Sequence, residues 1–120
     1  MTRVITVLIV EDEPLIRLDI AGELADMGFN VLEAENAEEA IAILDSARDV
    51  QIIFTDVDMP GALDGLSLAA AVRDRWPPIK IIVTSGLRRV AMDDLPADAL
   101  FVDKPYKADE LAASMHRMMA

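Results

Sequence analysis

The chain has 120 residues, 53% of them hydrophobic, which suffices for one globular domain with a single core. Its 11 lysines and arginines against 22 acidic residues give a formal net charge of −11, which repels phosphate backbones, so we expect no direct binding of nucleic acid. The chain has no cysteine, no signal-peptide layout and no apolar run near the roughly 18 residues that span a bilayer, so we expect a cytoplasmic protein without disulfides, thiolate metal sites or membrane insertion.

The first part of the chain predicts two strand–helix units. "VITVLIV" (4–10) is continuously apolar, as is typical of a strand buried on both faces of a parallel sheet. A helix is expected over 14–27, with Pro14 at its start and Gly28 after its end. "NVLEA" (30–34) predicts a second strand, and a second helix is expected over 37–46. The first helix is expected to pack through an apolar side made of Leu15, Leu18, Ala21 and Leu24. The second helix is expected to begin with a capping box made of Asn36 and Glu39.

The middle of the chain repeats this alternation. "QIIFT" (51–55) predicts a buried strand that ends at Asp56, and "KIIVT" (80–84) predicts another. Between them a helix is expected over 66–76, because Pro77 and Pro78 cannot continue it.

The last part predicts a final strand–helix unit and one doubtful helix. Residues 88–94 allow two helical turns at most before Pro96, "ALFV" (99–102) predicts a strand, and 108–119 predicts a helix. Five strand–helix repeats with short loops predict one α/β domain over 1–120, with a doubly wound parallel sheet between two layers of helices and no effector domain.

Ionisable and hydroxyl side chains follow four of the five predicted strands. They are Glu11, Asp12 and Glu13 after the first, Asp56 after the third, Thr84 and Ser85 after the fourth, and Asp103 and Lys104 after the fifth. Ligands of doubly wound sheets bind beyond the carboxyl ends of the strands. We therefore expect these groups to meet at one edge of the sheet.

Their chemistry indicates a phosphate site. Neighbouring carboxylates raise one another's pKa unless a cation lies among them, and oxygen ligands without histidine or cysteine favour Mg²⁺, with Mn²⁺ as a second candidate. A lysine and a threonine hydroxyl would both donate to phosphate oxygens. The set is suited to the transfer of a phosphoryl group onto a carboxylate.

Each residue also has a simpler interpretation. Asp12 could cap the first helix, Asp56 and Asp58 could be turn formers, the Thr84 hydroxyl could bond to backbone, and Lys104 could be solvated. These interpretations weaken together, because all the groups fall on one edge.

In these motifs the sequence resembles the receiver domain of two-component response regulators, over essentially all 120 residues. The matching pieces are "VLIVEDEP", "DVDMPG…LDGL", "IIVTSG" and "FVDKP". The resemblance implies a flavodoxin-like strand order 2-1-3-4-5 with helices on both faces. The chain departs from the commonest pattern in two places: "MPGALDG" is one residue longer between Pro60 and Asp64, and Asp58 adds a negative charge beside the site.

The resemblance also implies a metal site and its reaction. Asp56 would accept a phosphoryl group from the phosphohistidine of a sensor histidine kinase or of a histidine phosphotransfer protein. The metal ligands would be Asp12, Asp56, the backbone carbonyl of Asp58, and Glu11 mainly through a coordinated water.

Three further residues receive roles from the resemblance. Lys104 would pair with the phosphoryl group, Thr84 would move to hydrogen-bond it, and Phe101 would swing inward when Thr84 moves. The Lys104–Pro105 peptide bond would be cis.

We therefore expect a phospho-acceptor that phosphorylates and dephosphorylates itself and controls or relays to a downstream protein partner, rather than an enzyme. One alternative is a small phosphohydrolase of the haloacid-dehalogenase type. The stretch "IIFTDVDMPG" resembles the Asp-x-Asp motif of that family, although here the motif follows the third strand rather than the first. Another is a phosphate-independent interaction domain, although such domains usually lose part of the acidic, threonine and lysine set.

Overall fold

The computed structural model describes residues 4–46, 49–59, 64–85, 95–96 and 98–120. Strands and helices alternate along most of the chain, in the order β1 (Thr6–Val10), α1 (Pro14–Asp26), β2 (Asn30–Ala34), α2 (Ala37–Ser46), β3 (Ile52–Asp56), α3 (Gly65–Arg75), β4 (Lys80–Ser85), β5 (Leu100–Asp103) and α4 (Ala108–Met118).

The five strands form one sheet in the order β2-β1-β3-β4-β5, and every pair is parallel. This confirms the expected doubly wound, flavodoxin-like topology. The chain runs from β1 outward to β2 and then returns past β1 to β3. The strand order thus reverses between β1 and β3, and the carboxyl ends of these two strands flank the place where a ligand is expected.

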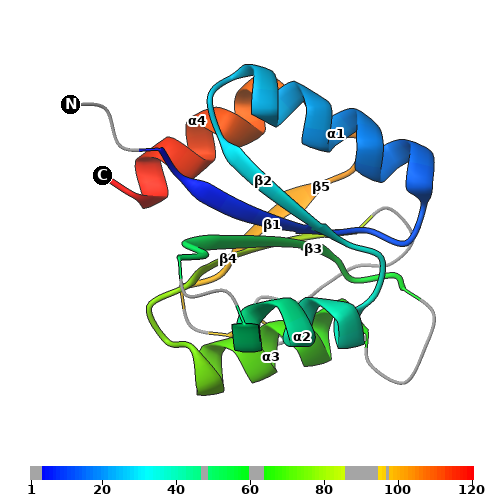
Figure 1. Ribbon diagram of the computed structural model, residues 1–120, viewed down its shortest axis with the longest axis vertical. Helices are drawn as coiled ribbons and strands as arrows, with labels where there is room; N and C mark the ends of the chain where they lie inside the picture. Colours follow the sequence, from blue (N-terminus) through cyan, green and yellow to red (C-terminus); the bar gives the residue numbers. More distant parts are fainter. Residues whose placement is uncertain (1–3, 47–48, 60–63, 86–94, 97) are drawn as a thin grey trace.

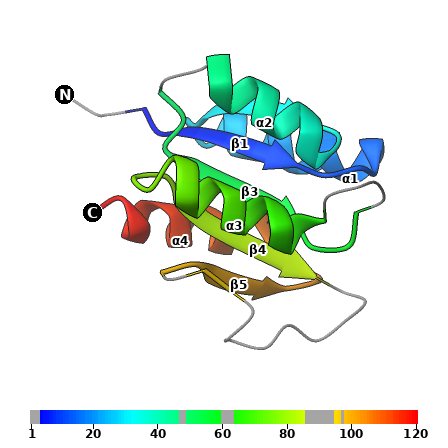
Figure 2. The same cartoon turned by 90° about the horizontal axis from the view of Figure 1, so that it is seen from below.

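Helices cover both faces of the sheet, which gives three layers (Figure 1). α1 and α4 pack on one face, and α2 and α3 pack on the other (Figure 2). Because side chains alternate along a strand, β1 serves both cores: Leu8 and Val10 join the α2/α3 side, whereas Val7 and Ile9 join the α1/α4 side. The central strands are therefore buried on both faces, as their continuous apolar runs predict.

The expected apolar side of α1 is partly wrong. Leu15 and Leu18 are 76% and 58% exposed, and the buried residues of the helix are Ile20, Ala21 and Leu24. Apolar residues occur on several sides of this helix, so their spacing alone does not select the face that packs on the sheet. The expected helix end is correct, since Gly28 follows α1 with φ of +96°, a conformation that favours glycine.

Most predicted boundaries agree with the structure to within one residue, although β1 starts two residues later than expected. The expected cap of α2 is present, because the Asn36 Oδ1 atom accepts a 2.7 Å hydrogen bond from the Glu39 amide. The expected short helix at 88–94 and the longer loop between Pro60 and Asp64 fall largely or wholly outside the described residues. Among the described helices, none is long and apolar enough to cross a membrane.

Candidate functional site

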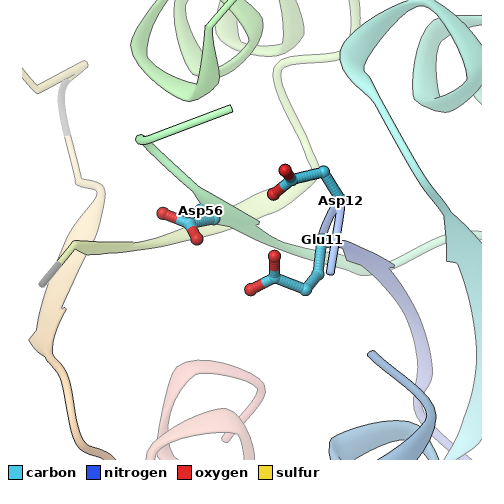
Figure 3. Close-up of side chains that lie close together, drawn as sticks. All are labelled: Glu11, Asp12 and Asp56. Atoms are coloured by element: carbon cyan, nitrogen blue, oxygen red, sulfur yellow. The ribbon is translucent and has the colours of Figure 1, made fainter. Parts of the chain in front are cut away.

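Three carboxylates converge at the carboxyl ends of β1 and β3 (Figure 3). Glu11 and Asp12 follow β1 directly, and Asp56 is the last residue of β3. One carboxylate oxygen from each lies within 4.8 Å of the others. Glu11 and Asp56 are each only 4% exposed, whereas Asp12 is half-buried. Three acidic groups this close, two of them buried, form a pocket of concentrated negative charge.

A single lysine faces this pocket from the end of β5. The Lys104 Nζ atom lies 2.6 Å from Asp56 Oδ2 and 3.7 Å from Glu11 Oε1. The Lys104–Pro105 peptide bond is cis, as the resemblance implied. The lysine side chain is 26% exposed, so it is neither fully solvated nor sealed inside the protein. Counted over the described residues, its ammonium group balances one of the three negative charges, so these four side chains together remain net negative.

The pKa values reflect this imbalance. Burial, together with the neighbouring Asp12 and Asp56, raises the pKa of Glu11 to about 7 in spite of a hydrogen bond from the Glu13 amide and the charge of Lys104. Burial alone would lower the pKa of Lys104, but its hydrogen bond to Asp56 and the charges of Asp56, Glu11 and Asp58 raise it above the usual value. The lysine is therefore firmly charged, while one carboxylate resists ionisation.

This donor set fits a divalent cation. The ligands are carboxylate oxygens without histidine or cysteine, which is the set that hard ions such as Mg²⁺ prefer. A second positive group beside these acids would also offset the burial and the repulsion from Asp56 that together raise the pKa of Glu11. The cluster of Glu11, Asp12 and Asp56 can thus hold a metal ion.

Backbone contacts fix Asp56 tightly. Its Oδ1 atom accepts a 2.9 Å hydrogen bond from the Asp58 amide, and the Val57 amide bonds to the Thr84 carbonyl at 2.9 Å. The first residue of α3, Gly65, packs directly on this segment: a Cβ there would lie 2.7 Å from the Val57 Cα and would collide with the Asp56 carbonyl. Glycine is required at this position because of that close approach.

Asp58 turns its side chain away from the three acids. Its Oδ2 atom accepts a 2.6 Å hydrogen bond from the Ser85 hydroxyl at the end of β4. Asp58 is not in the group of carboxylates that could share a metal ion. The role of its backbone carbonyl as a metal ligand stays a prediction.

Of the two expected switch residues, Thr84 lies beside Asp56, whereas Phe101 packs against the core. Thr84 pairs with Asp56 in the β3–β4 register and is 1% exposed. Its hydroxyl has no hydrogen-bond partner among the described residues. Phe101 is half-buried on β5, opposite Val83, and packs against the α2/α3 core. The simpler interpretation of Thr84, a hydroxyl bonded to backbone, is therefore wrong.

Two more of the simpler interpretations do not hold. The N-cap residue of α1 is Glu13 rather than Asp12, and no side chain caps that helix. Asp56 is the end of a buried strand and an ion-pair partner of Lys104, so it does more than form a turn.

Sequence reasoning missed Arg17. This side chain donates a 2.8 Å hydrogen bond to the Glu11 carbonyl and lies 3.3 Å from the Glu33 carboxylate on β2, so it ties α1 to the strand end that carries the acids. An arginine in the first turns of an acidic helix looks like a solvated charge in the sequence. No local signal identified its contact.

A family model described as "Response regulator receiver domain" matches residues 7–116. The chain is 37% identical over 118 residues to the sensor kinase CckA of Brucella abortus and 36% identical over 115 residues to the positive alginate biosynthesis regulatory protein of Pseudomonas aeruginosa. These alignments cover 95% and 92% of this chain but only 12% and 46% of the two relatives, so the chain corresponds to part of each.

Solved structures give the same result at the level of the fold. The response regulator protein TrrA of Thermotoga maritima, solved in complex with Mg²⁺-BeF, is 31% identical and superposes with a TM-score of 0.83. The match covers 94% of this chain and 97% of that one.

Proposed function

Because this chain belongs to the response regulator receiver domain family of two-component systems, we propose that it accepts a phosphoryl group on Asp56 in a Mg²⁺-dependent reaction. The observation that carries the proposal is the placement of a charged lysine 2.6 Å from a buried carboxylate, inside a group of acids that can hold a cation. This arrangement supplies a nucleophile and a positive charge for the incoming phosphate in one rigid frame.

The proposed transfer begins with attack of an Asp56 carboxylate oxygen on the phosphorus of a phosphohistidine. The new O–P bond makes an acyl phosphate, and the P–N bond breaks with its electron pair going to the imidazole nitrogen, which takes up a proton. Lys104 would stabilise the phosphoryl oxygens, and the Thr84 hydroxyl would donate to one of them. Bound Mg²⁺, held by Glu11, Asp12, Asp56 and the Asp58 carbonyl, would neutralise charge on the transferred group.

Hydrolysis would reset the site. Water attacks the phosphorus, the acyl phosphate is cleaved, and inorganic phosphate and the Asp56 carboxylate are released. We propose that the chain performs both steps on itself and is therefore a phospho-acceptor rather than a multiple-turnover enzyme. The haloacid-dehalogenase alternative would instead require the second acid of the Asp-x-Asp motif to act on the substrate, whereas here the Asp58 carboxylate accepts a hydrogen bond from Ser85.

The phosphodonor would be a sensor histidine kinase or a histidine phosphotransfer protein. An open groove of about 720 Å³ runs from Lys104 along α1, and its apolar lining includes Leu15, Ile16 and Tyr106. Leu15 is 76% exposed and Ile16 42% exposed, which leaves an uncovered apolar surface next to the nucleophile. A protein that delivers phosphohistidine to Asp56 would find its contact surface there.

Intact-mass spectrometry after incubation with Mg²⁺ and acetyl phosphate tests the central claim. The expected result is one added phosphoryl group on the wild type, dependent on Mg²⁺ and absent from Asp56→Asn. Consumption of donor over many turnovers without an adduct would instead indicate a hydrolase. No adduct and no consumption would indicate a phosphate-independent interaction domain.

The partner surface is tested separately with Leu15→Asp. This change should slow transfer from a phosphorylated histidine protein by about tenfold or more, through loss of apolar contact. Labelling by acetyl phosphate, which needs no protein contact, should be unchanged. Equal slowing with both donors would contradict the proposed surface.

A further inference from the structure

We propose that Ser85 and Asp58 form a positioning pair that holds the Asp58 segment for metal binding and links it to the end of β4. This inference rests on the proposed function, because it assigns the metal as Mg²⁺ and the Asp58 carbonyl as a ligand. It adds a residue, Ser85, that has no role in the metal site described above. The pair is defined by the 2.6 Å hydrogen bond from Ser85 Oγ to Asp58 Oδ2.

Asp58 is held from two sides. Its amide donates to Asp56 Oδ1 at 2.9 Å, and its carboxylate accepts from Ser85 at 2.6 Å. The peptide that carries the Asp58 carbonyl is also held through its own N–H, because the Met59 amide donates to the Val57 carbonyl at 3.1 Å, so it has little freedom to rotate. A carbonyl ligand must point at its ion, and Mg²⁺ tolerates little deviation from octahedral geometry. Loss of one restraint should therefore weaken metal binding.

The contact between Ser85 and Asp58 completes a closed ring of hydrogen bonds across three strand ends. Asp56 binds Asp58, Asp58 binds Ser85, the Ser85 carbonyl accepts from the Lys104 amide at 3.3 Å, and the Lys104 ammonium returns to Asp56 at 2.6 Å. A shift of any one of the strand ends β3, β4 or β5 therefore strains the contacts of the others. Ser85 is 3% exposed, so water does not readily replace its hydroxyl.

The charge of the Asp58 side chain gives the contact with Ser85 a second role. Asp58 is a carboxylate beside a pocket that is already net negative, and its charge contributes to the raised pKa of Lys104. The Ser85 hydroxyl turns this carboxylate toward β4 and supplies a charge-assisted hydrogen bond. The serine thus accommodates the extra acid that distinguishes this chain from the commonest receiver pattern.

The pair also lies next to the expected switch. Ser85 follows Thr84 directly on β4, and Ser85 pairs with Asp103 in the β4–β5 register. Movement of Thr84 toward a phosphoryl group would pull on the Ser85 hydrogen bond. The metal site and the switch strand would then respond to each other through this contact.

The test measures Mg²⁺ affinity by titration calorimetry, without phosphodonor, for Ser85→Ala in three backgrounds: wild type, Asp58→Asn and Asp58→Ala. Asparagine keeps an acceptor for the serine hydroxyl but removes the charge, whereas alanine removes both. We expect Ser85→Ala to weaken binding by about three- to tenfold in the wild-type and Asp58→Asn backgrounds, and by less than about twofold in the Asp58→Ala background.

Thr6→Val is the matched control, because it also removes a buried hydroxyl but lies at the opposite end of β1, and its Mg²⁺ affinity should equal that of the wild type. Circular dichroism and thermal unfolding show that each variant is folded. Effects of Ser85→Ala that are equal in all three backgrounds, or an unchanged affinity in the wild-type background, would overturn the pair.

Failure of the proposed function gives a different result. If the acids do not hold Mg²⁺, the wild-type protein will show no binding at all, and Asp12→Asn will match it. A wild type that binds Mg²⁺ and a Ser85→Ala variant that binds equally well would leave the receiver function intact and refute only the positioning pair.

Discussion

The two ends of the sheet carry polar side chains of opposite kinds. At the amino end, neutral groups form hydrogen bonds with one another. The Thr6 hydroxyl accepts from the side-chain amide of Asn30 at 3.2 Å, and the backbone amide of Thr6 donates to the side-chain oxygen of Gln51 at 2.9 Å. At the carboxyl end, three carboxylates lie close together, and the two buried ones, Glu11 and Asp56, form ion pairs with Lys104. The same strands support both ends, so the backbone does not explain the difference.

The contrast separates stability from function. Paired neutral groups cost little to bury and hold the strands in register. Like charges held close together destabilise the folded protein. Such clusters are found mainly at functional sites, where binding or catalysis makes use of them. Variants at the two ends should therefore differ in kind: changes at the carboxyl end should respond to metal, pH and phosphodonor, whereas changes at the amino end should respond to none of these.

The largest expected effect follows from removing the lysine. Lys104→Met should slow phosphorylation by acetyl phosphate by about 100-fold or more, because one preorganised charge on a transferred group is typically worth that much. The rate of adduct formation by mass spectrometry measures it. A rate within threefold of the wild type would show that the ammonium group is a structural counter-charge only.

The next effect is a pH dependence of stability without metal. The folded protein holds the Glu11 proton up to a pKa of about 7, above the reference value of 4.5, so the folded state binds more protons between these values. The contribution of Glu11 to the free energy of unfolding should therefore be most favourable below pH 4.5. It should fall by roughly 1–3 kcal/mol as the pH rises to about 7.

Urea unfolding at pH 5.5 and pH 8 measures this difference, after correction with Glu11→Gln, which should lack the Glu11 contribution. Saturating Mg²⁺ at pH 8 should restore the stability of the wild type, since the ion binds the ionised folded form. An identical pH dependence in wild type and Glu11→Gln would contradict the assignment.

A smaller effect is expected at the amino end. Thr6→Val should lower the free energy of unfolding by about 1 kcal/mol, because the side-chain amide of Asn30 loses its hydrogen-bond acceptor. This loss should be the same at pH 5.5 and pH 8 and with or without Mg²⁺. A loss that depended on Mg²⁺ would mean that the two ends of the sheet are coupled.

The smallest effect on folding is expected at Asp58. Asp58→Asn should change the lifetime of the phosphorylated protein by about threefold, while the Mg²⁺-free stability changes by less than about 0.5 kcal/mol, since asparagine still accepts from Ser85. Loss of phosphoprotein over time by mass spectrometry gives the lifetime. Lifetimes that match within error with the same donor would refute a role for the charge.

The sequence predicted the parts of the fold that depend on local patterns. Continuous apolar runs such as Ile52–Phe54 identified the buried central strands, and Pro14 and Gly28 marked the ends of α1. The face of α1 could not be predicted, because Leu15 and Leu18 belong to the helical pattern yet lie beyond the region that the sheet covers.

The site was predictable as a set of strand ends but not as a network. Parallel strands bring their carboxyl ends together, so Glu11, Asp12, Asp56 and Lys104 could be expected to meet. The contacts of Arg17 with Glu11 and of Ser85 with Asp58 join residues whose side chains have several directions open to them. Those directions are decided by packing, which the sequence does not express.

The Thr84 hydroxyl has no hydrogen-bond partner among the described residues, and under the proposed function this affects the balance between the unphosphorylated and phosphorylated forms. A buried hydroxyl without a hydrogen bond raises the free energy of the state that contains it by about 1–3 kcal/mol. A phosphoryl oxygen that accepted this hydrogen bond would return that amount, which corresponds to a factor of roughly 5 to 150 in the ratio of the two forms. The resting protein would thus already contain part of the driving force for its own change of shape, at a single oxygen atom.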